Sequence, residues 1–182
     1  MTAEGRAVRH GGSAVTALER GFTHSWRIRI RYAETDAMGV VYHANYITFF
    51  EVGRVEYLRS ADVDYRALEE QKMTGAVVEV GVRYHAPARF DDELSIYTRC
   101  ASMGKVRFRM EYEIWREADR TLVVSGHTDH ALLSHETLRP VRIPEAVKAG
   151  VARFEASRGT AFAGSATHAP EPAPPMGAWR RG

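Results

Sequence analysis

The chain has 182 residues, of which 45% are hydrophobic, 26% charged and 10% aromatic, and its formal net charge is +2. This length fits one domain with a sizeable core, and so small a charge does not predict a nucleic-acid partner. The single cysteine, Cys100, excludes an internal disulfide and a cysteine-rich zinc site. It favours a reducing compartment, which we expect to be the cytoplasm.

Both ends of the chain have the composition of disordered extensions. Residues 1–22 lack the apolar run of a secretory signal, although an Arg-bearing transit peptide is an alternative interpretation. Residues 156–182 are rich in Ala, Pro and Gly and offer little to bury. No stretch approaches the roughly 20 apolar residues of a membrane span. The folded domain is therefore predicted to cover residues 23–155.

The domain begins with a predicted strand, loop and helix. The segment HSWRIRIRY (residues 24–32) alternates apolar residues with arginines, which is typical of a half-buried strand. Residues 33–42 contain Asp36 and Gly39 and are predicted to form a loop. Apolar side chains of residues 43–60 cover far more than one stripe, which predicts a helix buried on most sides.

The rest of the domain changes to an alternating period. A short helix is predicted near residue 65, and four candidate strands span residues 76–90, 92–102, 105–117 and 121–134. Their links are short and turn-like, which predicts an antiparallel meander. Gly104 is available for positive φ in the second link, and Pro144 is predicted to start a last helix.

One architecture accounts economically for this order of elements. It is an α+β fold in which one curved antiparallel sheet wraps a long central helix. One sheet face and one helix cannot cover all the apolar surface, so we expect a dimer.

Asp36 is the first candidate for chemistry. An Asp before a helix is usually an N-cap or turn residue. Here Gly39 to His43 separate Asp36 from the helix, so it is a poor local cap and is placed to face the helix N-terminus. That terminus carries free N–H groups and a partial positive charge suited to an oxyanion. An acid beside such a site is the minimum equipment for acyl transfer to water.

Several other polar residues have two interpretations each. His43 is either a surface histidine or a partner of Asp36 within a group that includes Tyr42 and Asn45. Glu51 and Arg54 are three residues apart on the helix, which favours a structural ion pair at a buried interface over catalysis by Glu51.

The segment GHTDHALLSH invites comparison with a metal site. On a strand, His127 and Asp129 share one face whereas His130 points to the other. Two ligands on one side are too few for zinc, so no metal is predicted.

Basic residues near the strand ends are candidate ligands of a phosphate group. Lys105 and Arg107 flank the predicted hairpin, Arg83 lies on another strand and Arg139 follows the last one. Most surface arginines have no specific ligand, so each assignment depends on the identity of the substrate.

The stretch from residue 31 to residue 60 resembles the hot-dog-fold acyl-CoA thioesterases of the 4-hydroxybenzoyl-CoA thioesterase type. Within that family it is most similar to the short acyl-CoA thioesterases associated with the Tol–Pal system. The resemblance covers roughly residues 23–150. The residues that carry it are Tyr32, Glu34, Thr35, Asp36, Gly39, Val40, Val41, Tyr42, His43, Asn45, Tyr46, Phe49, Phe50, Glu51 and Arg54.

The resemblance implies a set of roles. Asp36 would be the catalytic carboxylate, as nucleophile or general base, with His43 beside it. The helix N-terminus would polarise the thioester carbonyl, with oxyanion and substrate contacts from Tyr42, Ala44, Asn45 and Tyr46. CoA would be bound by Lys105, Arg107, Arg83 and Arg139.

The resemblance also implies an assembly and a substrate class. Such enzymes use no metal or other cofactor, and their site lies between subunits of a homodimer or homotetramer. Met38 stands where small residues are usual, which predicts a narrower acyl pocket. The substrate would be an acyl-CoA; an aromatic acyl-CoA of benzoyl or naphthoyl type, and a non-catalytic acyl-CoA-binding protein, are the alternatives.

Overall fold

The computed structural model describes residues 17, 20–63 and 65–157, so most of both predicted extensions lies outside the described residues. In chain order the elements are β1 (His24–Arg29), the 3-10 helix η1 (Tyr32–Glu34), α1 (Asn45–Ser60), α2 (Tyr65–Glu70), β2 (Met73–Tyr84), β3 (Glu93–Met103), β4 (Arg107–Arg116), β5 (Thr121–Ser134) and α3 (Glu145–Ser157). The predicted α+β architecture is confirmed. None of the described helices is both long enough and apolar enough to cross a membrane.

The five strands form one antiparallel sheet in the order β1-β3-β4-β5-β2. The predicted meander is therefore wrong for its first strand, because β2 pairs with β5 and not with β3. Alternation identifies a strand but not its partner. The predicted strand also ran too far, since residues 85–92 form a loop in which Pro87 has no N–H to offer a ladder.

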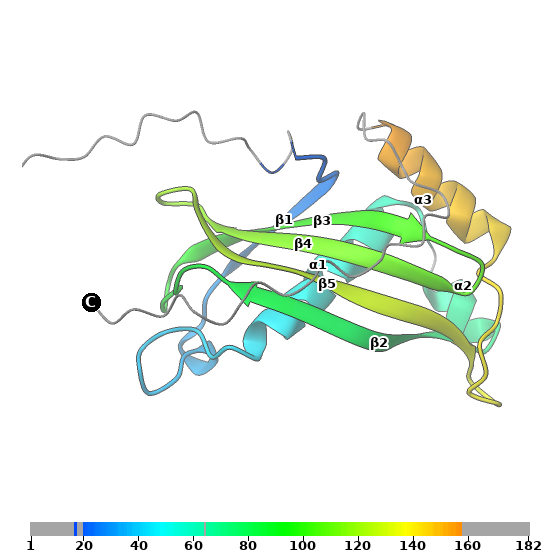
Figure 1. Ribbon diagram of the computed structural model, residues 1–182, viewed down its shortest axis with the longest axis horizontal. Helices are drawn as coiled ribbons and strands as arrows, with labels where there is room; N and C mark the ends of the chain where they lie inside the picture. Colours follow the sequence, from blue (N-terminus) through cyan, green and yellow to red (C-terminus); the bar gives the residue numbers. More distant parts are fainter. Residues whose placement is uncertain (1–16, 18–19, 64, 158–182) are drawn as a thin grey trace, which may run out of the picture.

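The helix α1 crosses one face of the sheet, and α2 and α3 gather near the end of the sheet away from the loop that precedes α1 (Figure 1). Gly53 allows the close approach of α1 to β3. A Cβ there would lie 2.7 Å from side-chain atoms of both Ile96 and Thr98. The helix is buried on its sheet side only, because Ile47 on the other side is 42% exposed. The prediction of a helix buried on most sides is thus wrong for a single subunit.

The outer face of the sheet carries a small second core. Phe22 and Ala17, which the sequence assigned to the N-terminal extension, pack there with Tyr97 and Trp115. The strand β1 is buried unevenly, since Trp26 is 44% exposed.

The predictions for the β3–β4 turn and for the start of the last helix have different outcomes. The β3–β4 turn forms, but Gly104 is not among the described glycines with positive φ. The helix α3 begins directly after Pro144, as predicted.

Candidate functional site

Residues 35–41, the Asp36 loop, fold back on themselves directly before α1. Thr35 and Val41 form an antiparallel bridge, and the Asp36 N–H donates to the Val40 carbonyl at 2.9 Å. Gly39 closes the turn by donating to the Asp36 carbonyl at 2.9 Å, and its φ of +71° is a conformation that favours glycine. The turn thus reverses the chain. Asp36 lies next to the bridge between Thr35 and Val41, and from Val41 the chain continues into the helix.

The Asp36 carboxylate is held at one oxygen and left open at the other. Its Oδ1 accepts the Met38 N–H at 2.8 Å, an interaction typical of an Asx turn. The other oxygen has no hydrogen-bond partner among the described residues, and the side chain is partly exposed. Met38 is 76% exposed, so within one subunit it does not narrow a pocket. Asp36 therefore combines a fixed orientation with a free oxygen.

The N-terminus of α1 is uncapped. Ala44 is its N-cap residue and makes no side-chain cap hydrogen bond. Within residues 20–63 and 65–157, the N–H groups of His43, Ala44 and Tyr46 have no hydrogen-bond partner. Unpaired N–H groups at the positive end of a helix dipole are suited to binding an oxyanion.

Tyr84, at the end of β2, orients this terminus. Its hydroxyl donates to the His43 carbonyl at 3.0 Å. Because the peptide unit is planar and trans, the Ala44 N–H of the same unit points away from that carbonyl. Tyr84 was not predicted from the sequence, since nothing local to it indicates that β2 ends beside α1.

The other predicted residues around Asp36 divide into outward-facing and structural side chains. Tyr42 and His43 are exposed, and their ring centroids are 4.4 Å apart. Asn45 uses its amide to donate to the Glu34 carbonyl at 2.8 Å, which ties the helix to the preceding turn. Tyr46 is 3% exposed, and burial raises its pKa to about 12. The side chains of Asn45 and Tyr46 thus have structural roles beside the site.

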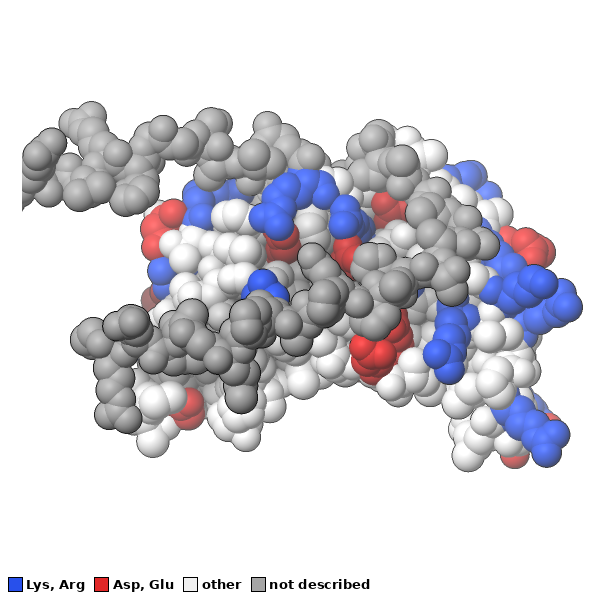
Figure 2. Space-filling view, viewed as in Figure 1, with Lys and Arg blue, Asp and Glu red and all other residues white. Residues whose placement is uncertain are grey.

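The four candidate phosphate ligands do not form one cluster within a subunit. Arg83 pairs with Ser125, and Arg107 with Ala131, which places the two arginines about 20 Å apart along β5. Lys105 lies near Arg107, and its carbonyl accepts the Ile143 N–H at 2.8 Å. Figure 2 shows Lys and Arg gathered at this end of the molecule, over the β3–β4 turn and the segment after β5. Arg139 lies in that segment, whereas Arg83 lies at the Asp36 end of the sheet.

One group of side chains has the composition of a metal site. Glu79, His127 and Asp129 place ligand atoms within 4.8 Å of one another. Glu79 was not predicted from the sequence, because β2 was expected elsewhere in the sheet. Both Asp129 oxygens accept hydrogen bonds from Arg109, at 2.6 and 2.5 Å, which lowers the pKa of Asp129. His130 lies on the opposite face, as predicted, and burial lowers its pKa to about 4. The positive charge of the Arg109 guanidinium thus already balances the Asp129 carboxylate, in the place that a metal ion would take.

The predicted Glu51–Arg54 ion pair is not present among the described residues. Arg54 is buried near the Tyr112 side chain, whereas Glu51 is exposed. The ion-pair prediction is therefore wrong for a single subunit.

Known proteins resemble the chain over the region that holds this site. The profile of the thioesterase-like superfamily matches residues 30–151, which contain the Asp36 loop, α1 and strands β2–β5. The acyl-CoA thioesterase YbgC of Haemophilus influenzae is 36% identical over 134 residues, which cover 72% of this chain and 95% of that protein. The acyl-CoA thioester hydrolase YbgC of Escherichia coli is 34% identical over 124 residues, covering 68% and 92%.

A solved structure agrees with these sequence relatives. The DHNA-CoA thioesterase from Staphylococcus aureus superposes with a TM-score of 0.68 at 29% identity, covering 72% of this chain and 90% of that one.

Proposed function

The chain belongs to the thioesterase-like superfamily and is a thioester hydrolase, and from that premise we propose that it hydrolyses acyl-CoA to a free acid and CoA. The observation that carries the proposal is the position of Asp36, which has a free oxygen and lies in the loop leading to the uncapped N-terminus of α1. The relatives named YbgC support the acyl-CoA part of the proposal.

The reaction divides the work between Asp36 and the helix. The thioester carbonyl oxygen accepts hydrogen bonds from free N–H groups at the start of α1, which stabilise the negative charge that develops there. In the general-base route, water attacks the carbonyl carbon, Asp36 takes the proton, and the CoA thiolate leaves. In the nucleophilic route, Asp36 attacks and CoA leaves, and water then hydrolyses the anhydride. Both routes require the same free carboxylate oxygen.

The active assembly is a homodimer built on β2, with a homotetramer as the larger alternative. β2 is an edge strand of 12 residues. Val77, Val78 and Val80 on it are 51%, 47% and 37% exposed. A long apolar edge favours pairing with another strand.

Antiparallel pairing of two β2 strands would bring the basic end of one subunit beside the Asp36 end of the other. CoA could then reach Lys105, Arg107 and Arg139 from a thioester held at Asp36. Light scattering should give at least a dimer at micromolar concentration. An active monomer would contradict a shared site.

Two alternatives concern the ligand and the chemistry. An aromatic acyl-CoA is favoured by the likeness to a DHNA-CoA thioesterase and by the exposed rings of Tyr42 and Tyr84 near the helix start. A non-catalytic acyl-CoA-binding protein would have no use for a carboxylate with a free oxygen.

A panel of acyl-CoAs tests the proposal. The full chain is incubated with short, long and aromatic acyl-CoAs, and released thiol is measured. We expect thiol release with at least one class, and the preferred class identifies the acyl group. Binding of acyl-CoA without thiol release across the panel would support the non-catalytic alternative.

A further inference from the structure

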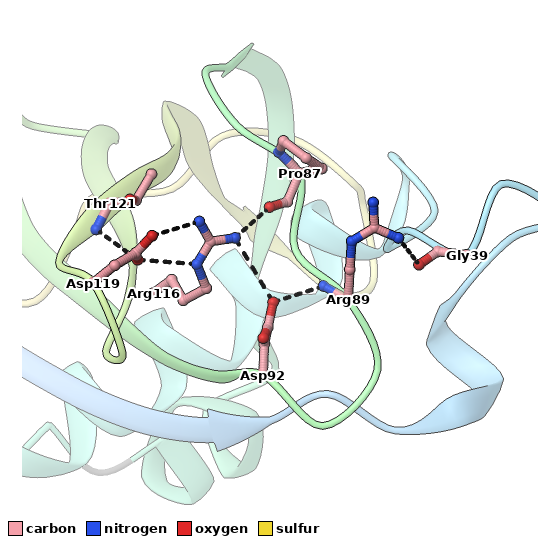
Figure 3. Close-up of polar contacts among 7 residues, drawn as sticks. All are labelled: Gly39, Pro87, Arg89, Asp92, Arg116, Asp119 and Thr121. Carbon is pink, nitrogen blue, oxygen red and sulfur yellow. Dashed lines mark hydrogen bonds and ion pairs between the residues drawn. The ribbon is translucent and has the colours of Figure 1, made fainter. Parts of the chain in front are cut away.

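The Asp36 loop rests on a second loop, residues 85–92, which we call the supporting loop. The Val41 N–H donates to the Ala88 carbonyl at 2.8 Å, and Ala88 is completely buried. Arg89 reaches the Gly39 carbonyl with a longer contact of 3.5 Å (Figure 3). The position of the Asp36 loop therefore depends on where the supporting loop lies.

The supporting loop also touches α1. The backbone of Ala88 also lies near the Tyr46 side chain, in the first turn of the helix, and influences the pKa of its hydroxyl. One buried residue thus contacts both parts of the proposed site, the carboxylate loop and the helix terminus. A shift of the supporting loop would change the distance between them.

Arg116, at the end of β4, holds the supporting loop to the sheet. Its Nη1 donates to the Pro87 carbonyl at 2.8 Å and lies 3.8 Å from a carboxylate oxygen of Asp92. Its Nε and Nη2 donate to the two oxygens of Asp119 at 3.0 and 2.8 Å. Figure 3 shows the guanidinium between Asp119 on one side and Pro87 and Asp92 on the other.

Asp92 completes the hold on the loop. Its Oδ2 accepts the Arg89 N–H at 2.8 Å, and its carbonyl accepts the Ile30 N–H at 3.0 Å. Asp92 therefore links Arg116 to the loop and to the chain directly after β1. The Arg116 guanidinium therefore holds the supporting loop on both sides of Ala88, at Pro87 and at Asp92.

We propose that Arg116 is a positioning residue that sets the place of Asp36 relative to the N-terminus of α1 through the supporting loop. This inference rests on the proposed function, because it assigns to Arg116 the geometry of that reaction. Arginine suits the role because its planar fork can donate to Asp119 and to Pro87 at the same time. A lysine ammonium is a single point charge on a flexible stem.

Steady-state kinetics of Arg116→Ala and Arg116→Lys test the inference. A misplacement of about 1 Å can cost roughly 10²-fold in rate, so we expect kcat of Arg116→Ala to fall about 10- to 100-fold with KM nearly unchanged. Arg116→Lys should lose less, and it remains informative if the alanine variant does not fold.

The matched control is Arg99→Ala. Arg99 also donates to a carboxylate, that of Glu111, and to a backbone carbonyl, that of Arg20, but it makes no contact with the supporting loop. Its kcat should stay within about twofold of wild type. An equal loss in both alanine variants would mean a general structural effect and would overturn the inference.

A double mutant separates this inference from the proposed function. If Arg116 acts through Asp36, adding Arg116→Ala to Asp36→Asn should lower the residual rate by less than about twofold, since coupled changes are not additive. If Arg116→Ala lowers the rate of Asp36→Asn by the same factor as it lowers the wild-type rate, Arg116 does not act through Asp36. Near wild-type activity of Asp36→Asn alone would instead remove the role of Asp36 in the proposed mechanism. A folded Arg116→Ala with normal kcat beside an inactive Asp36→Asn would remove this inference alone.

Discussion

Each end of α1 has a carboxylate nearby, and the two carboxylates are surrounded in opposite ways. Asp36, before the N-terminus, is partly exposed and accepts one hydrogen bond at 2.8 Å. Glu155, from α3, is 2% exposed near the other end. Its Oε1 accepts hydrogen bonds from Tyr57 at 2.6 Å, the Cys100 N–H at 2.9 Å and Thr23 at 3.1 Å.

The difference separates a carboxylate that can react from one that holds the fold. Three donors on one buried oxygen fix Glu155 and leave it no access to a substrate. Burial and the neighbouring Glu155 raise the pKa of both Tyr57 and Cys100, so both keep their protons. Asp36 instead keeps a free oxygen, in the loop that leads to the unpaired N–H groups at the start of α1. In the proposed mechanism, proton transfer therefore takes place at the N-terminal end of α1.

An apolar cavity lies at the far end of α1. Its lining comes from the end of the helix, the sheet, α2 and the segment that leads into α3, and includes Leu58, Leu68, Met73, Phe108, Leu132 and Ile143. None of the described residues that line it has an ionisable side chain. The cavity is thus consistent with packing at this end of the helix and with the proposed chemistry at the other end.

The largest effect on stability is expected at Glu155. Glu155→Ala should lower the free energy of unfolding by roughly 3 kcal/mol or more, because each buried donor without an acceptor costs about 1–3 kcal/mol. Chemical denaturation measures the loss. The control Glu145→Ala, at an exposed position on the same helix, should change stability by less than about 0.5 kcal/mol. The division between the two ends fails if Glu155→Ala is as stable as wild type, or is stably folded but inactive.

A smaller effect, on rate, is expected at Tyr84. Tyr84→Phe removes the donor to the His43 carbonyl and loosens the peptide that carries the Ala44 N–H. We expect kcat to fall about 10-fold, less than the roughly 10²–10³-fold loss on removing an oxyanion donor itself. Tyr32→Phe, at a ring that is 78% exposed, is the control. Equal kcat values for the two variants would exclude a role for Tyr84 in orienting the terminus.

The smallest effect is expected at the basic end of the sheet. Lys105→Ala and Arg107→Ala should each raise KM about 3- to 10-fold with little change in kcat, since a charged contact to CoA phosphate would be lost in ground and transition states alike. The increase should shrink at high salt. An unchanged KM in both variants would move phosphate binding to Arg83 or Arg139.

The sequence predicts the features that depend on neighbouring residues. The loop around Asp36 and Gly39 and the long helix both follow from local pattern, and the helix start is displaced by only two residues. The strands were also found, because alternation is a local signal.

Features that depend on distant pairing were missed. Tyr84 meets His43 across 41 positions, and Arg116 meets Pro87 across 29. Both contacts require β2 to lie beyond β5 with the supporting loop crossing back to β3, and no local pattern specifies that crossing. The observed pairing of β2 with β5 also places Glu79 beside His127 and separates Arg83 from the end of the sheet that holds Lys105.

The most direct test of the central claim is the rate of thiol release by Asp36→Asn, measured beside acyl-CoA binding by the same variant. The substitution keeps the size of the side chain and an acceptor for the Met38 N–H. We expect kcat to fall roughly 10²–10⁴-fold, the range of general acid–base catalysis, with binding retained. The control Asp62→Asn makes the same chemical change just past the other end of α1 and should hydrolyse acyl-CoA at the wild-type rate. A folded Asp36→Asn that turns over several acyl-CoAs at near wild-type rate would contradict the account.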